Sequence, residues 1–104
     1  MGIAGRSSVH ILAEWYRPAI ADEPLGRSIA RIIQSAAAVS ATGSPVRLRA
    51  TLAIPDDEIV LAVFDSASEQ SVAQVCLEAG CPAQRLTAGI DIRFWRRPSE
   101  RQRP

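Results

Sequence analysis

One histidine and two carboxylates are the residues of this 104-residue chain best suited to chemistry. His10 could act as a general base oriented by Glu14 or Asp91, because imidazole is the side chain that titrates near neutral pH. The same residues could ligate a metal, but one strand would hold His10 and Glu14 roughly 13 Å apart, too far to share an ion. A metal there would therefore need Asp91 or residues from a second copy of the chain.

Two cysteines are the other reactive residues. Cys76 follows the apolar spacing of a helix and is predicted to pack in the core. Cys81 follows the end of that helix and could be exposed, so it could join His10 and carboxylates in sequestering a metal. A single thiol without a second histidine is a weak sign of nucleophilic catalysis. The sequence also lacks a glycine-rich phosphate loop, zinc-ligand spacing and a nucleophile elbow.

Composition excludes several classes of protein. The net charge is +1 and aromatic residues make up 5% of the chain, which argues against nucleic-acid binding by electrostatics or base stacking. No apolar run approaches the roughly 20 residues of a membrane helix, and the first residues, MGIAGRSS, do not resemble a secretory signal. We therefore expect a cytoplasmic protein with reduced thiols and no membrane or nucleic-acid partner.

Hydrophobic periodicity predicts an α+β domain. Alternation predicts strands over 8–16, 46–54, 58–64 and 85–95, and helical spacing predicts helices from Asp22 to Thr42 and from Ser66, as cap, to Gly80. The order βαββαβ is that of the ferredoxin-like fold, a four-stranded antiparallel sheet with both helices on one face. Right-handed crossovers place the first and third strands in the centre. Residues 1–95 form this single domain, and 96–104 are expected to be a flexible basic tail.

The two faces of the predicted sheet differ. The face under the helices is expected to carry Val9, Ile11, Leu48, Leu52, Leu61, Val63, Ile90 and Ile92. The other face is expected to carry His10, Leu12, Glu14, Tyr16, Val60, Ala62 and Phe64, flanked by Thr87, Asp91 and Arg93 and by Arg47, Arg49 and Thr51. This second face is too apolar to remain exposed to solvent, and too polar to be buried without hydrogen-bonding or ionic partners. Two copies packed through it, as a dimeric α+β barrel or sandwich, would satisfy both requirements.

Several short motifs resemble a known family. They are Glu14, Tyr16 and Pro18 in ILAEWYRP; Val46-Arg47, Thr51, Pro55, Asp57-Glu58 and Phe64 in the hairpin; Ser68-Glu69 and Val72; and AGCPAQRL from Ala79 to Leu86. From Val9 to Ile92 the chain resembles a small ferredoxin-like family of unknown function, common in actinobacteria, whose best-described branch binds nickel. The resemblance implies a homodimer. The nickel branch is rich in histidine, whereas His10 is the single histidine here.

The sequence leaves three functions open. The leading hypothesis is a homodimeric module without an assigned activity that binds a small organic ligand on the uncovered face. Its predicted contacts are His10, Leu12, Glu14, Tyr16, Arg47, Arg49 and Phe64. The second is nickel binding or sequestration. The third, by fold analogy alone, is a cyclase, isomerase or cofactor-free oxygenase with His10 as its base. Alternatively, the carboxylates pair with Arg47, Arg49 or Arg93 and only hold the dimer in register.

Overall fold

The computed structural model of the chain describes residues 9–16 and 25–93. Its elements are β2 (Val9–Tyr16), α2 (Leu25–Ala41), β3 (Val46–Ile54), the 3-10 turn η1 (Pro55–Asp57), β4 (Ile59–Ser66), α3 (Glu69–Glu78) and β5 (Arg85–Ala88). This order confirms the predicted βαββαβ α+β fold. The predicted helix start at 22–24 and the predicted tail at 96–104 lie outside the described residues.

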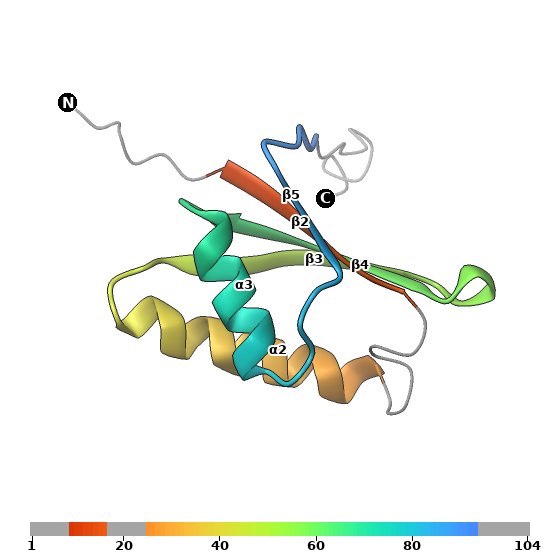
Figure 1. Cartoon of the computed structure of the whole chain (residues 1–104), viewed down its shortest axis with the longest axis horizontal. Coiled ribbons are helices and arrows are strands. Elements are labelled where there is room, and N and C mark those ends of the chain that lie inside the picture. The colour runs from red at the N-terminus through yellow and green to blue at the C-terminus, as the bar shows by residue number, and fades with distance from the viewer. Residues whose placement is uncertain (1–8, 17–24, 94–104) are drawn as a thin grey trace, which may run out of the picture.

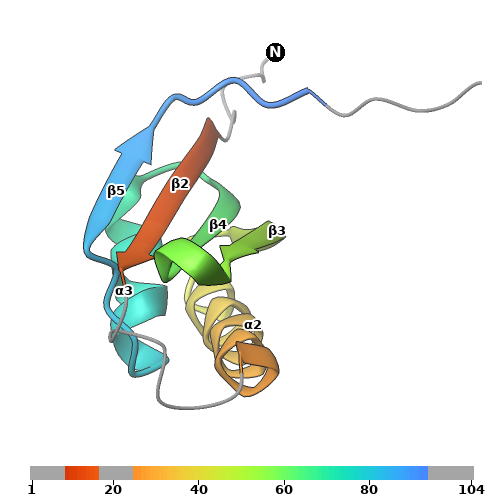
Figure 2. The ribbon, with the colours of Figure 1, turned by 90° about the vertical axis from the view of Figure 1, so that its right-hand side faces the viewer.

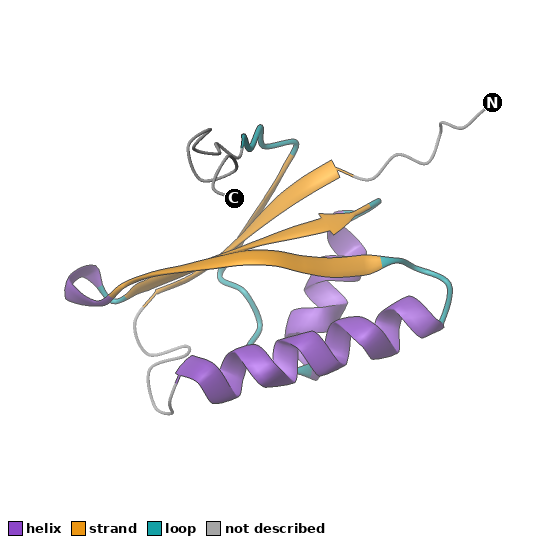
Figure 3. Cartoon of the chain, turned by 180° about the vertical axis from the view of Figure 1, so that it is seen from behind, coloured by secondary structure: helices purple, strands orange, loops and turns teal. Residues whose placement is uncertain are grey.

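The four strands form one antiparallel sheet in the order β3-β4-β2-β5. The first and third strands of the chain are therefore central, as predicted. Both helices pack against the same face of this sheet (Figures 1 and 2), and the view from behind shows the sheet as one layer above the helices (Figure 3). None of the described helices is long and apolar enough to cross a membrane.

Hydrogen bonds from small polar side chains fix where the helices begin and end. At the end of α2, the Ser40 hydroxyl accepts from the Val46 amide and donates to the Val46 carbonyl, which sets the path into β3. Helix α3 starts at Ser68, whose side chain accepts from the Ser71 amide. The predicted cap at Ser66 is wrong, because Ser66 is the last residue of β4. Its hydroxyl contacts the Ser68 backbone instead.

Strand β4 faces the helices with the opposite set of residues from the predicted one. Ala62 and Phe64 are buried and Val60 packs against the core, whereas Leu61 and Val63 are only half-buried. Both alternating sets of this strand are apolar, so its own sequence does not distinguish the faces. The pairing with β2 determines which set of β4 residues faces the helices. Phe64 lies opposite Ile11 and Ala62 lies opposite Ala13, and all four are buried.

A β-bulge reverses the faces of β3 midway along the strand. Leu48 lies opposite Phe64 and Ala50 lies opposite Val63, so the register shifts by one residue around Arg49. Before the bulge, Val46 and Leu48 face the helices. After it the alternation is inverted, and the positions predicted for Leu52 and Thr51 are wrong. Leu52 lies opposite Leu61 on the uncovered face with 57% of its surface exposed, and Thr51 lies opposite Ala62.

The last strand is shorter than predicted. β5 ends at Ala88, where Gly89 adopts a φ of +75°, and the amides of Gly89 and Ile90 both donate to the His10 carbonyl. A turn of this kind needs the left-handed conformation that glycine adopts without strain. Asp91 and Arg93 consequently lie beyond the sheet, and the prediction that placed them on its uncovered face is wrong.

Candidate functional site on the open face of the sheet

The candidate site is the sheet face opposite α2 and α3, called the open face below. Side chains directly opposite one another in neighbouring strands share a face, so the register defines four cross-strand rows. From β3 towards β5 the rows are Arg47, Asp65 and His10; Ala50, Val63, Leu12 and Thr87; Leu52, Leu61, Glu14 and Arg85; Ile54, Ile59 and Tyr16.

The first row holds a histidine against a carboxylate. His10 Nε2 lies 3.2 Å from Asp65 Oδ1, and Arg49 Nε lies 3.6 Å from Asp65 Oδ2. The carboxylate therefore sits between an imidazole and a guanidinium, with one oxygen towards each. An imidazole whose Nε2 proton points at a carboxylate keeps its lone pair on Nδ1. This arrangement can position a base.

The third and fourth rows hold a second polar cluster around Glu14. The Tyr16 hydroxyl donates a 2.5 Å hydrogen bond to Glu14 Oε1, and Arg85 Nε lies 3.8 Å from Glu14 Oε2. The hydrogen bond to Glu14, then burial, then the charge of that carboxylate raise the pKa of Tyr16 above its ordinary value of 10.0. Tyr16 is therefore a neutral hydrogen-bond donor at neutral pH.

Apolar side chains fill the open face between and around the two clusters. Leu12, Val63, Leu61 and Ile59 are half-buried, and Leu52 is the exposed large apolar residue among them. An exposed apolar surface of this kind on a small domain is typical of a binding or association site. The open face thus combines an apolar contact surface with two internally paired polar clusters.

Most of the residues predicted from sequence to bind a ligand lie on the open face. His10, Leu12, Glu14, Tyr16 and Arg47 occupy their predicted face, and Arg49 reaches it from the bulge. The predicted position of Phe64 is wrong. Its side chain is fully buried against the helices, because β4 has the opposite phase.

The carboxylates predicted to orient His10 do not reach it. Asp91 forms its ion pair with Arg93 at 3.0 Å, and 71% of each side chain is exposed. Glu14 belongs to the second cluster. The partner of His10 is Asp65, which sequence reasoning did not consider. Asp65 becomes visible only when β2 is paired with β4, which puts it directly opposite His10.

Both cysteines lie on the helix side of the sheet. Cys76 is fully buried, as predicted, and burial together with the neighbouring Cys81 thiol raises its pKa from 9.0 to about 12. Cys81 is also buried, so the expectation that it could be exposed is wrong. Trp15 Nε1 donates a 2.8 Å hydrogen bond to the Cys81 carbonyl and fixes this loop under the sheet. Cys81 and His10 therefore lie on opposite faces and do not meet within one chain.

Donor clusters for a metal are absent from the part of the chain that the structure describes. In residues 9–16 and 25–93, no group of three histidine, cysteine, aspartate or glutamate side chains is arranged to hold an ion. His10 and Glu14 are each engaged with other side chains.

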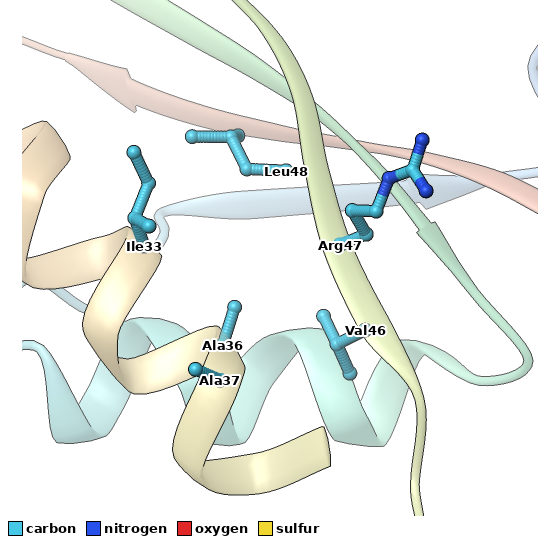
Figure 4. Close-up of a pocket in the computed structure, with 6 residues that line it drawn as sticks. All are labelled: Ile33, Ala36, Ala37, Val46, Arg47 and Leu48. Atoms are coloured by element: carbon cyan, nitrogen blue, oxygen red, sulfur yellow. The ribbon is translucent and has the colours of Figure 1, made fainter.

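A shallow groove of about 300 Å³ lies elsewhere, between α2 and β3. Ile33, Ala36, Val46 and Leu48 line it, and the guanidinium of Arg47 points away from it (Figure 4). Its lining is apolar and brings no titratable group into the groove. This groove is therefore a weaker candidate site than the open face, which carries both polar clusters.

Comparison with known proteins supports the fold. No family model and no curated protein matches the sequence. The structure is similar to the crystal structure of SCO4226 from Streptomyces coelicolor A3(2), with a TM-score of 0.59 and 16% sequence identity over 82% of this chain and 99% of that one. At this identity the likeness shows a shared α+β fold with a protein of an actinobacterium.

Proposed function

We propose that this protein is a homodimeric binding module in which two open faces pack together and enclose a small organic anion with an apolar body. One observation carries the proposal. The open face carries apolar side chains between and around its two polar clusters, and its carboxylates are already paired within the chain.

Internal pairing makes this face suitable for burial. An isolated charge is expensive to remove from water, whereas a charge with hydrogen-bonding or ionic partners is less so. Asp65 contacts His10 and Arg49, and Glu14 contacts Tyr16 and Arg85. In the described part of the chain, no buried side-chain nitrogen or oxygen lacks a partner. A second copy can therefore cover the face without stranding a carboxylate.

The size of the open face also fits a second copy. Strands β2 and β4 have eight residues and are roughly 27 Å long, whereas β5 has four residues. With neighbouring strands about 4.8 Å apart, each copy offers about 450 Å². Two such faces bury about 900 Å², close to the lower limit for a specific interface. The half-exposed leucines and isoleucines supply the apolar area, and Leu52 is positioned to contact the partner.

Charge on the open face favours an anionic ligand. The guanidinium groups of Arg47, Arg49 and Arg85 outnumber the carboxylates of Asp65 and Glu14. Arg47 makes no ion pair with another described residue, so its guanidinium can take an external anion. Arginine suits a carboxylate because its planar fork donates two parallel hydrogen bonds. The ligand class that fits is a small carboxylate carrying an apolar group.

Sedimentation equilibrium tests the dimer with two matched variants. Leu52→Glu introduces a charge on the open face, and Leu77→Glu introduces the same charge on the outer surface of α3, where Leu77 is 64% exposed. We expect the wild type and Leu77→Glu to be dimers and Leu52→Glu to be a folded monomer. A wild-type monomer at micromolar concentration, or a dimeric Leu52→Glu variant, contradicts the proposed interface.

Calorimetry with 3-phenylpropanoate tests the ligand class. This probe is a carboxylate with an apolar ring, and we expect it to bind the wild-type dimer and the Leu77→Glu variant. Arg47→Gln should weaken binding at least fivefold, because it removes the open guanidinium and leaves the interface apolar residues in place. The absence of heat with the wild type contradicts the proposed ligand class.

Nickel binding is the alternative function, and its support is the sequence resemblance. A site would need donors from both copies, since His10 and Glu14 lie in separate clusters of one chain. The same calorimeter tests it with nickel chloride. Tight binding of nickel that is lost in His10→Gln would favour the alternative over an organic anion.

A further inference from the structure

We propose that the row formed by Arg47, Asp65 and His10 is a proton-transfer site acting on small carbonyl compounds with an acidic C–H next to the carbonyl. This inference rests on the proposed function, because the second copy must cover the row and keep bulk water from it. It adds a reaction and a substrate class, the 2-oxo carboxylates with an apolar side chain. The first row provides a base, a group that positions the base, and a cation.

His10 is the base. Its Nε2 faces Asp65 Oδ1 at 3.2 Å, so the lone pair that can accept a proton is on Nδ1. Asp65 is a positioning residue, held in turn by Arg49 on its second oxygen. An imidazole oriented by a fixed carboxylate is suited to general-base catalysis.

Arg47 is the cation of this row. One arm of its guanidinium takes the substrate carboxylate, and the other faces the adjacent 2-oxo oxygen, where negative charge develops. Arg47 lies opposite Asp65 in register, on the far side of β4 from His10. Two strand spacings separate β2 from β3, so the two side chains arise about 10 Å apart across the sheet. An elongated small molecule lying across Asp65, between the open face and the second copy, can reach both side chains. Val63 and Leu12 of the second row then contact its apolar side chain.

The reaction is a tautomerisation in which atoms and electrons balance. The C–H bond next to the carbonyl breaks and its proton passes to His10 Nδ1. The electron pair of that bond forms the C=C bond of an enolate, and the carbonyl oxygen takes the negative charge beside Arg47. The imidazolium then returns the proton to that oxygen, which yields the enol, or to carbon, which regenerates the ketone. Nothing is oxidised or reduced.

Deuterium exchange into phenylpyruvate tests the inference. Phenylpyruvate matches 3-phenylpropanoate but carries an acidic C–H beside its carbonyl, and proton NMR in deuterium oxide follows the loss of that signal. We expect the wild type to accelerate exchange above the buffer rate at least a hundredfold. His10→Gln should return exchange to the buffer rate. Asp91→Asn, the same chemical change as Asp65→Asn at an exposed position outside the sheet, should leave exchange unchanged.

Asp65→Asn separates a positioning role from a structural one. If Asp65 positions His10, this variant lowers kcat at least tenfold while KM and the affinity for 3-phenylpropanoate stay within twofold, and Asp65→Glu recovers part of kcat. A purely structural role would weaken binding and dimerisation together. Equal loss of kcat and affinity therefore contradicts the assignment.

The outcomes distinguish the two proposals. A wild-type protein that dimerises and binds 3-phenylpropanoate but leaves phenylpyruvate unexchanged overturns the proton-transfer site and spares the binding module. A protein that neither dimerises nor binds 3-phenylpropanoate overturns the binding module and, with it, the enclosed site. Exchange that persists in His10→Gln overturns the assignment of the base.

Discussion

The two faces of the sheet are built from the same strands and differ in how their polar groups are satisfied. On the helix-covered face, polar side chains bond to backbone carbonyls: Trp15 to Cys81, Arg31 to Ala79 and Ser35 to Val75. On the open face, polar side chains bond to one another, in the His10–Asp65–Arg49 and Glu14–Tyr16–Arg85 clusters.

This difference separates what stabilises the monomer from what is available for binding. A side chain that bonds to a distant backbone carbonyl locks two segments of one chain together, since the acceptor cannot move without its strand or loop. A side chain that bonds to another side chain can exchange that partner for a ligand or a second copy at small cost. The covered face therefore specifies the fold, and the open face carries the candidate function.

The largest expected effect is on the covered face. Phe64→Ala removes a fully buried ring and should lower the free energy of unfolding by about 3–5 kcal/mol. Leu61 lies three residues earlier on the same strand, but its side chain is on the open face and is only half-buried. In the monomer, Leu61→Ala should therefore lower the free energy of unfolding by about 1 kcal/mol. Urea unfolding measures both.

Measuring the unfolding of Phe64→Ala and Leu61→Ala at several protein concentrations tests whether the open face is a dimer interface. If the open face is a dimer interface, the destabilisation caused by Leu61→Ala grows with protein concentration, since only the dimer loses that contact. The effect of Phe64→Ala does not come from the interface. A Leu61→Ala effect as large as that of Phe64→Ala at all concentrations would show that the open face belongs to the monomer core.

The fold was predictable from sequence because its signals are local and agree with one another. Pro55, Gly43 and Gly80 lie at a turn or just beyond a helix, and helical and alternating spacings separate cleanly between them. The faces of individual strands were less predictable. β4 is apolar on both sides, and a single inserted residue at Arg49 reverses the second half of β3. Neither feature can be predicted from the alternation of apolar and polar residues within one strand.

Only the part of the candidate site that lies on a single strand could be predicted from the sequence. β2 alternates clearly, so His10, Leu12, Glu14 and Tyr16 are on their predicted face. Their partners depend on the register between strands, which sequence alternation does not define. Asp65 was missed for this reason. Asp91 was wrongly included because the conformation of Gly89 ends the strand before it.

An intermediate effect is expected on the covered face at alkaline pH. Below pH 9 the Cys76 thiol is protonated in both states and adds no pH dependence. Between pH 9 and about 12 the unfolded chain releases this proton and the folded chain retains it. The free energy of unfolding should then fall by about 1.4 kcal/mol per pH unit from this group. Urea unfolding over this range, with Cys76→Ala as the comparison, measures the slope, and equal slopes in the two proteins would contradict the burial of the thiol.

The smallest expected effect is a titration on the open face, and it tests whether the Glu14 cluster is interlocked. Tyr16 is the single tyrosine of the chain, so the near-ultraviolet absorbance of tyrosinate reports its ionisation alone. Glu14 raises the pKa of Tyr16 and Arg85 lowers it. Glu14→Gln should therefore move the midpoint down towards 10.0, because the neutral amide does not oppose the phenolate charge, and Arg85→Gln should move it up. Glu78→Gln is the matched control, since Glu78 bonds Gln74 on α3. Shifts of the Tyr16 midpoint in opposite directions in Glu14→Gln and Arg85→Gln would establish the cluster in solution. A midpoint unchanged in both variants would mean that the open face is an ordinary solvated surface.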